Sequence, residues 1–182
     1  MYPSEWAANS AIYDYHALPE KIEIIPFGVN LDDSPSLEQV FPNKRASPCR
    51  LRLLFVGRDW SRKGGDIAFQ TLISLCDQGI DAELTMVGSV LPVNVQHDKL
   101  KVISYLNKNS IRERKLLDEI FLKASLFIFP TLADCSPLVI GEANAFDFLC
   151  LPQMLEEYQQ LLKMVKMVIC CLSQLQGMIT LI

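Results

Sequence analysis

The sequence has no paired-cysteine motif, no basic stripe and no long apolar run, and each absence argues against a class of function. Its six cysteines form no C-x-x-C pair and no spacing that suits a zinc site, so we expect free thiols in a reducing compartment and no metal. Seventeen Lys and Arg residues against 21 Asp and Glu residues leave a formal net charge of −4. Basic and aromatic residues do not cluster, which argues against nucleic acid as a partner.

Membrane and export signals are also missing. The most apolar run, MVICCL, is far shorter than the roughly 20 residues that a membrane-spanning helix needs. The first residues, MYPSEWAANSAIYDY, show neither the basic nor the apolar region of a signal peptide. We therefore expect a cytoplasmic chain without a membrane span.

Short apolar segments and helical segments alternate along the chain. Apolar spacing predicts a helix at 66–79, ended by Gly79, and another at 110–124, where Ser110 and Glu113 form a capping box. Four compact apolar runs bounded by Gly or Pro predict strands buried on both faces, at 22–25, 51–57, 82–88 and 125–130. This alternation predicts an α/β fold with a doubly wound parallel sheet.

Polar residues follow the second of these strands, in GRDWSRKGGDIAF (57–69). In a doubly wound sheet, ligands bind beyond the carboxyl ends of the strands. Arg58 and Lys63 supply donors suited to phosphate oxygens, and Gly64-Gly65 let the backbone approach a ligand closely. The alternative is an ordinary solvated loop, because no complete glycine-rich nucleotide motif is present.

A second polar segment, PTLADCSPLVIGEANAF (130–146), follows the fourth strand. Ser136 as N-cap and Pro137 at the first helical position predict a helix whose amino end faces the ligand crevice and suits a diphosphate. Glu142 is placed to accept two adjacent ribose hydroxyls, and Asp134 to reach a sugar beyond the diphosphate. The alternatives are a turn aspartate and an exposed helix carboxylate.

Together these segments resemble the donor-binding, C-terminal half of a family 4 glycosyltransferase of the GT-B fold. The resemblance covers roughly residues 4–146 in the family's order, in SEWAANSAIYDYHALPEKIEIIPFGVN, LLFVGRDWSRKGG, AELTMVGS, ISYLNKNS and FIFPTLADCSPLVIGEANAF. It implies a Rossmann-like domain and retaining transfer of a sugar from a nucleotide-diphosphate sugar. The donor is a substrate, and no cofactor or metal is implied.

The resemblance also assigns catalytic roles. Arg58 and Lys63 would hold the diphosphate and stabilise the charge of the leaving nucleotide. Asp134 and Glu142 occupy the two ends of the family's E-x7-E motif, the first near the donor sugar and the second on the ribose. Asp134 departs from the commoner Glu and is one methylene shorter, which puts the sugar contact in question.

Further donor-binding positions follow from the same resemblance. The amides of Leu138 and Val139, at the helix start, would face the phosphates. Gly28 lies in a loop near the donor. Tyr105 and Leu106 fall where the base is commonly held.

The resemblance and the composition divide the chain into four parts. These are a remnant of the inter-domain join at 1–30, a linker or surface excursion at 31–50, an incomplete donor-binding domain at 51–150 and an out-of-frame tail at 151–182. The acceptor half of a GT-B enzyme would precede residue 1, so we expect a donor-binding fragment that is inactive alone and is completed by a separately encoded N-terminal domain.

The tail is interpreted as the product of a frameshift near Cys150–Leu151. One choice of codons for 152–168, read one nucleotide earlier, gives TTDVGGIPTIIKNGKNG, which the family would place there. Each Lys-Met-Val, at 163–165 and 166–168, must then give Asn or Asp followed by Gly. The alternative is a genuine amphipathic helix at 153–182.

Two other readings of the whole chain stay open. One is a non-catalytic nucleotide-sugar-binding module, and the other is an inert product of a decayed gene. A dehydrogenase-type Rossmann domain is disfavoured, because no G-x-G-x-x-G follows a strand.

Overall fold

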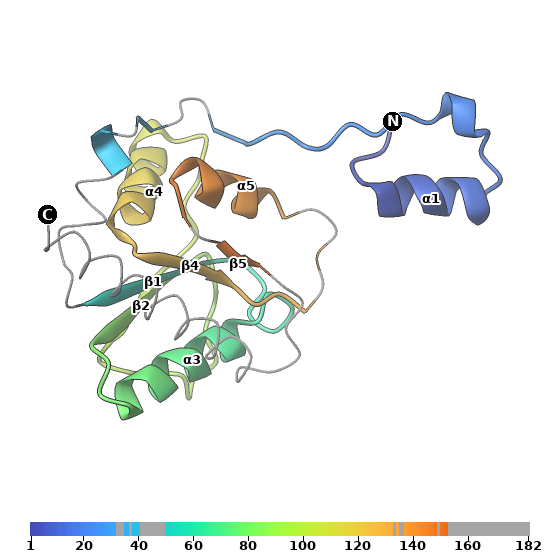
Figure 1. The fold of residues 1–182 in the computed structure, drawn as a ribbon. Helices are drawn as coiled ribbons and strands as arrows, with labels where there is room; N and C mark the ends of the chain where they lie inside the picture. Colours follow the sequence, from blue (N-terminus) through green and yellow to red (C-terminus); the bar gives the residue numbers. More distant parts are fainter. Residues whose placement is uncertain are drawn as a thin grey trace, which may run out of the picture.

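A parallel β-sheet forms the centre of the structure (Figure 1). The structure is a computed structural model that describes residues 1–31, 35–36, 38–40, 50–132, 134, 137–148 and 150–152, the last three by backbone alone. The strands lie in the order β3-β2-β1-β4-β5, and all neighbours are parallel. They are β1 (Leu51–Val56), β2 (Ala82–Val87), β3 (Leu100–Ile103), β4 (Leu126–Phe129) and β5 (Cys150–Pro152).

Helices cover both faces of the sheet, as a doubly wound fold requires. The helix α3 (Gly65–Asp77) lies on one face, and α4 (Ile111–Lys123) and α5 (Leu138–Ala145) lie on the other (Figure 1). Successive side chains of a strand point to opposite faces. Leu53 therefore joins the apolar cluster under α3, while its neighbour Leu54 joins the cluster under α4 and α5. Burial on both faces explains why these strands read as continuous apolar runs.

Aromatic rings fill the core between the sheet and α4. The ring of Phe121 on α4 stacks on Phe146 with centroids 4.9 Å apart and lies 6.1 Å from that of Phe127 on β4. Phe121 is almost fully buried. These contacts hold α4 and the end of α5 against the same face of the sheet.

The N-terminal segment lies apart from the sheet (Figure 1). It contains α1 (Glu5–Tyr13), which begins where the Ser4 hydroxyl accepts a hydrogen bond from the Ala7 amide, and the short helix η1 (Pro19–Lys21). The strand predicted at 22–25 is wrong. The segment makes only an isolated bridge between Ile24 and Tyr2 and pairs with no strand of the described sheet.

The other three predicted strands and both long helices are confirmed, with ends that differ from the prediction by one residue or two. β3 and β5 were not predicted. β3 is a short edge strand whose middle residues are exposed, so it lacks the buried pattern of the central strands. The predicted capping box of α4 is wrong. Ser110 is the N-cap residue, but its side chain makes no capping hydrogen bond, and the Glu113 carboxylate accepts a hydrogen bond from the Asn107 amide instead.

Two predicted parts of the chain fall mainly outside the described residues. Of the linker at 31–50, the structure describes only 31, 35–36, 38–40 and 50. Of the tail at 151–182, it describes Leu151 and Pro152, which belong to β5 and pair with β4.

Candidate functional site

The loops that follow β1 and β4 pack tightly against each other. Gly64 has a positive φ of 75°, and a Cβ atom there would lie 1.9 Å from the carbonyl oxygen of Pro130. The Leu132 amide and the Thr131 hydroxyl both donate to the carbonyl oxygen of Arg62, at 2.9 and 3.2 Å. Gly64 is therefore needed where two protein loops meet, a reason for this glycine that the sequence did not reveal.

A cleft of about 360 Å³ opens beside these loops. Val56 and Gly57 at the end of β1 and Phe129 at the end of β4 form part of its wall. The sequence of strands reverses between β1 and β4, because β2 and β3 lie on one side and β5 on the other. In open α/β sheets this reversal is the position where ligands bind. The remaining lining residues are Asn30, Lys63, Lys108, Asp134, Pro137, Leu138, Val139 and Glu142.

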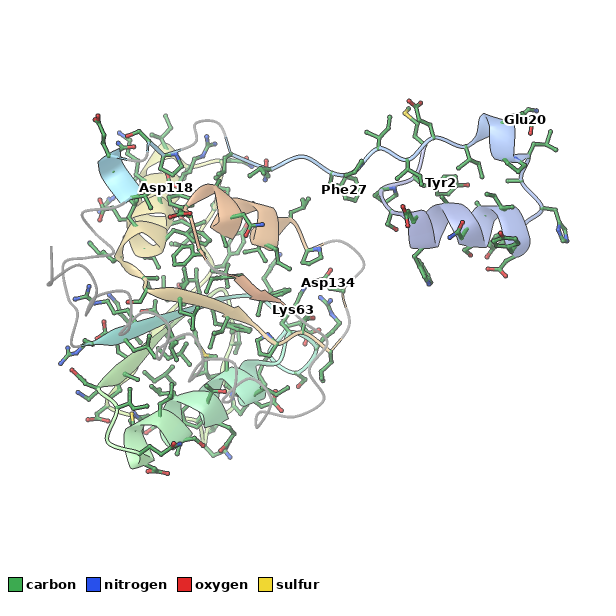
Figure 2. The ribbon with its side chains drawn as sticks, viewed as in Figure 1. Tyr2, Glu20, Phe27, Lys63, Asp118 and Asp134 are labelled. Carbon is green, nitrogen blue, oxygen red and sulfur yellow. The ribbon has the colours of Figure 1, made fainter. Side chains whose placement is uncertain are left out.

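An ion pair joins Lys63 and Asp134 across the two loops. The side chains are 16% and 14% exposed, and Figure 2 shows them together near the ends of β1 and β4. The ammonium group of Lys63 also lies over the Phe129 ring, 5.0 Å from its centroid, where the ring's negative face attracts it. Asp134 is thus more than a turn residue, since its carboxylate is the partner of a cation in the cleft.

A second ion pair joins Lys108 and Glu142, which also line the cleft. Glu142 is 2% exposed, and its Oε1 accepts a hydrogen bond of 2.5 Å from the Nζ of Lys108. The alternative of an exposed helix carboxylate is therefore wrong. A carboxylate this deeply buried needs a partner, because an uncompensated buried charge costs several kcal/mol, on the order of 3–5.

A smaller cavity of about 150 Å³ lies on the α4 side of this pair and shares Lys108 and Glu142 with the main cleft. Asp118 and Arg114 of α4 also line it. Burial raises the pKa of the Asp118 carboxyl, the nearby charges of Arg114 and Lys108 oppose that shift, and the charge of Glu142 adds to it. Four charged side chains of both signs therefore lie close together behind the cleft.

The structure places α5 with its amino end at the cleft. The helix begins at Leu138, one residue later than predicted, and Pro137 is its N-cap residue. Ser136, the predicted cap, lies outside the described residues. Leu138 and Val139 both line the cleft. The first amides of a helix have no carbonyl partner within it, and with the helix dipole they favour an anion.

Four other predicted site residues lie outside the lining of the cleft. The guanidinium of Arg58 lies over the Tyr105 ring, 4.7 Å from its centroid, and both residues are exposed. Leu106 packs against the core under α4 and α5. Gly28 lies exposed in the N-terminal segment.

Sequence reasoning missed Lys108 and Asn30 as lining residues. Lys108 follows β3, so recognising 100–103 as a strand would have singled it out by the same rule that singled out Lys63. Asn30 follows no strand of the sheet, and its position comes only from the path of the N-terminal segment. No feature of the sequence marked it.

The described residues hold neither a metal-binding cluster nor a membrane-spanning helix. They contain no group of three or more His, Cys, Asp or Glu side chains that could hold a metal ion. None of their helices combines the length and the apolar character needed to cross a membrane.

Sequence comparison relates part of the chain to a glycosyltransferase. A protein of Sulfolobus islandicus filamentous virus (isolate Iceland/Hveragerdi), named "Putative glycosyltransferase 45", is 32% identical over 79 residues, which are 43% of this chain and 21% of the viral protein. No protein-family model matches the chain. Less than half of the chain is therefore similar in sequence to the protein of that name, and the match spans only a small part of the viral protein.

Structural comparison identifies the fold. The crystal structure of WaaG, a glycosyltransferase involved in lipopolysaccharide biosynthesis, matches with a TM-score of 0.62 at 20% identity, over 82% of this chain and 42% of WaaG. The chain thus has the Rossmann-like α/β fold of a glycosyltransferase domain. It spans less than half the length of that neighbour.

Proposed function

We propose that the cleft binds a nucleotide-diphosphate sugar and that the chain is the donor-binding part of a retaining glycosyltransferase of the GT-B type, family 4. One observation carries the proposal: Lys63 with Asp134, and Lys108 with Glu142, meet the amino end of α5 around a single cleft at the reversal point of the sheet. The similarity to two glycosyltransferases supports it.

The diphosphate would lie between Lys63 and the start of α5. The amides of Leu138 and Val139 and the ammonium of Lys63 all favour phosphate oxygens. Arg58 would reach the diphosphate from the rim by leaving the Tyr105 ring. When the bond from the anomeric carbon to the diphosphate oxygen breaks, the electron pair stays on that oxygen, and these groups would stabilise the new charge without a metal.

The remaining contacts would orient the rest of the donor. Glu142 would accept hydrogen bonds from the ribose hydroxyls, and Asp134 would contact the sugar. Tyr105 and Leu106 would hold the base, with Gly28 near the donor. A cleft of about 360 Å³ falls in the range of about 300–1,000 Å³ that is usual for small-molecule sites.

Transfer to an acceptor is part of the proposal only for a completed enzyme. Catalysis requires the acceptor to be held against the reacting carbon. We propose that groups outside the donor cleft supply that function, and that the cleft by itself binds the donor without transferring the sugar.

Calorimetric titration with UDP, GDP and ADP tests the phosphate site. Lys63→Ala should weaken the binding of the preferred nucleotide about 10- to 150-fold, the range for hydrogen bonds to charged groups. Arg58→Glu should abolish it. Lys123→Ala is the matched control, because that lysine lies in the last turn of α4 with its side chain 68% exposed, outside the cleft lining. A parent chain that melts cooperatively and binds none of the three nucleotides contradicts the proposal.

A second comparison tests the sugar site. Asp134→Asn removes the negative charge that pairs with Lys63 but keeps the size of the side chain. Binding of the plain nucleoside diphosphate should persist or tighten, because Lys63 becomes available to the phosphates. Any extra affinity gained from the attached sugar should fall. If Asp134→Asn weakens both ligands equally, Asp134 has no specific contact with the sugar.

A further inference from the structure

Lys108 is a cation of the cleft for which the pattern of the sequence predicted no role. It lies in the connection between β3 and α4, and its Nζ contacts Oε1 of Glu142 on α5 at 2.5 Å. The Lys108 side chain is 37% exposed, whereas that of Glu142 is 3% exposed. Lys108 is therefore partly exposed to solvent, while the carboxylate that it binds is almost completely buried.

The loop that carries Lys108 is held by hydrogen bonds on both sides of it. The Nε of Arg114 donates to the Lys108 carbonyl oxygen at 2.8 Å. The Asn107 amide donates to the Glu113 carboxylate at 2.7 Å, and the Ser110 amide donates to the Asn107 carbonyl oxygen at 2.9 Å. Two of these bonds come from side chains of α4, so the position of the Lys108 backbone is set by a helix of the core.

The ion pair with Lys108 determines which oxygen of Glu142 can bind a ligand and how the carboxylate is oriented. A carboxylate has two oxygens, and Lys108 binds Oε1, so Oε2 would be the oxygen that accepts from a ligand in the cleft that Glu142 lines. A lysine also neutralises the buried charge, and its direct bond restricts rotation of the carboxylate group. Removing Lys108 would leave Glu142 as an uncompensated buried charge, which favours a different side-chain position.

We infer that Lys108 is a positioning residue that acts through Glu142 and sets the preference of the cleft for a ligand with ribose hydroxyls. This inference rests on the proposed function, in which Glu142 accepts hydrogen bonds from the ribose. The ribose hydroxyls donate to Glu142, and Lys108 keeps that carboxylate correctly turned. Lys108 itself makes no contact with the phosphates.

The test compares a nucleoside diphosphate with its 2′,3′-dideoxy analogue by calorimetry. The parent chain should bind the ribose form about 10- to 150-fold more tightly, the range for hydrogen bonds to a charged acceptor. In Lys108→Met that ratio should fall toward one, because affinity for the ribose form drops while affinity for the dideoxy form stays. Glu142→Gln should show the same pattern, and Lys108→Arg should restore most of the preference.

Lys63→Met is the control that separates this role from a general loss of positive charge. Lys63 faces the proposed phosphate position, so its removal should weaken both ligands by the same factor and leave their ratio unchanged. A thermal melt of each variant checks that it is folded. If Lys108→Met does not melt cooperatively, Lys108→Gln replaces it, because glutamine keeps a hydrogen-bond donor without the charge.

The outcomes distinguish failure of this inference from failure of the proposed function. A Lys108 variant that weakens the ribose and dideoxy forms equally, or that weakens neither, overturns the role of Lys108 and leaves the donor site intact. A folded parent chain that binds no nucleoside diphosphate overturns the proposed function and this role with it. The inference is supported if the preference for the ribose form over the dideoxy form is lost in Lys108→Met and recovered in Lys108→Arg.

Discussion

Replacing Gly64 by alanine should destabilise the fold more than the same change at another glycine of matching backbone conformation. Gly64 has φ of +75° and Gly79 has φ of +76°. A Cβ atom at Gly64 would lie 1.9 Å from the Pro130 carbonyl oxygen, whereas at Gly79 it would meet no described atom within 4 Å. The two positions therefore share the cost of a left-handed conformation and differ in the space around it.

The expected difference follows from these two contributions. A left-handed conformation costs an L-residue about 1–2 kcal/mol, which is the whole expected loss in Gly79→Ala. Overpacking adds about 1–3 kcal/mol, so Gly64→Ala should lose about 2–5 kcal/mol. At about 2–4 °C per kcal/mol for a chain of this size, Tm should fall by about 2–8 °C in Gly79→Ala and by about 4–20 °C in Gly64→Ala.

The assay is thermal and urea unfolding of the two variants beside the parent, followed by circular dichroism. The larger loss in Gly64→Ala should appear in both experiments, because it belongs to the native packing of the loops after β1 and β4. Equal losses in the two variants would refute the conclusion that the loops approach too closely for a side chain. A shared urea dependence confirms that the same cooperative transition is compared.

Three further predictions concern the core and the charged groups. Phe121→Ala should cost about 3–5 kcal/mol in urea unfolding, and a loss below about 1 kcal/mol would contradict its stacking on Phe146. Burial raises the pKa of Asp118 above 3.8, so the contribution of this carboxyl to the free energy of unfolding is complete at low pH and is lost as pH rises through the raised pKa. Asp118→Asn should remove this pH-dependent loss of stability, which urea unfolding at a series of pH values measures. Hydrogen bonding to Arg50 lowers the pKa of Asp81, so Arg50→Gln should cause a small loss of stability at pH values above 3.8 and no loss at pH values well below 3.8. An equal loss at pH 2.5 and at pH 7 would refute this.

Much of the fold could be predicted because its central strands carry a strong local signal. β1, β2 and β4 are buried on both faces, so their residues are nearly all apolar and the strands are visible in the sequence. The edge strand β3 lacks that signal, since much of its surface faces solvent. The segment at 22–25 shows the opposite error: it is apolar, but no strand of the described sheet lies beside it.

The candidate site was predictable only in part, for a similar reason. Lys63, Asp134 and Glu142 stood out because they follow strands that could be recognised. Lys108 did not, because the strand before it was missed. The burial of Glu142 was also invisible, since a carboxylate in a helix is usually exposed, and only its pairing with Lys108 makes its buried position tolerable.

The sequence alone therefore determined the fold class, the rhythm of strands and helices, and the loops in which the charged residues occur. These properties depend on periodicity and on neighbouring residues. Only the tertiary structure decided which charges meet. Lys63 and Asp134 are 71 positions apart in the sequence, and Lys108 and Glu142 are 34 positions apart. Each pair forms only because strand order and loop packing bring separate connections together at the carboxyl ends of the strands.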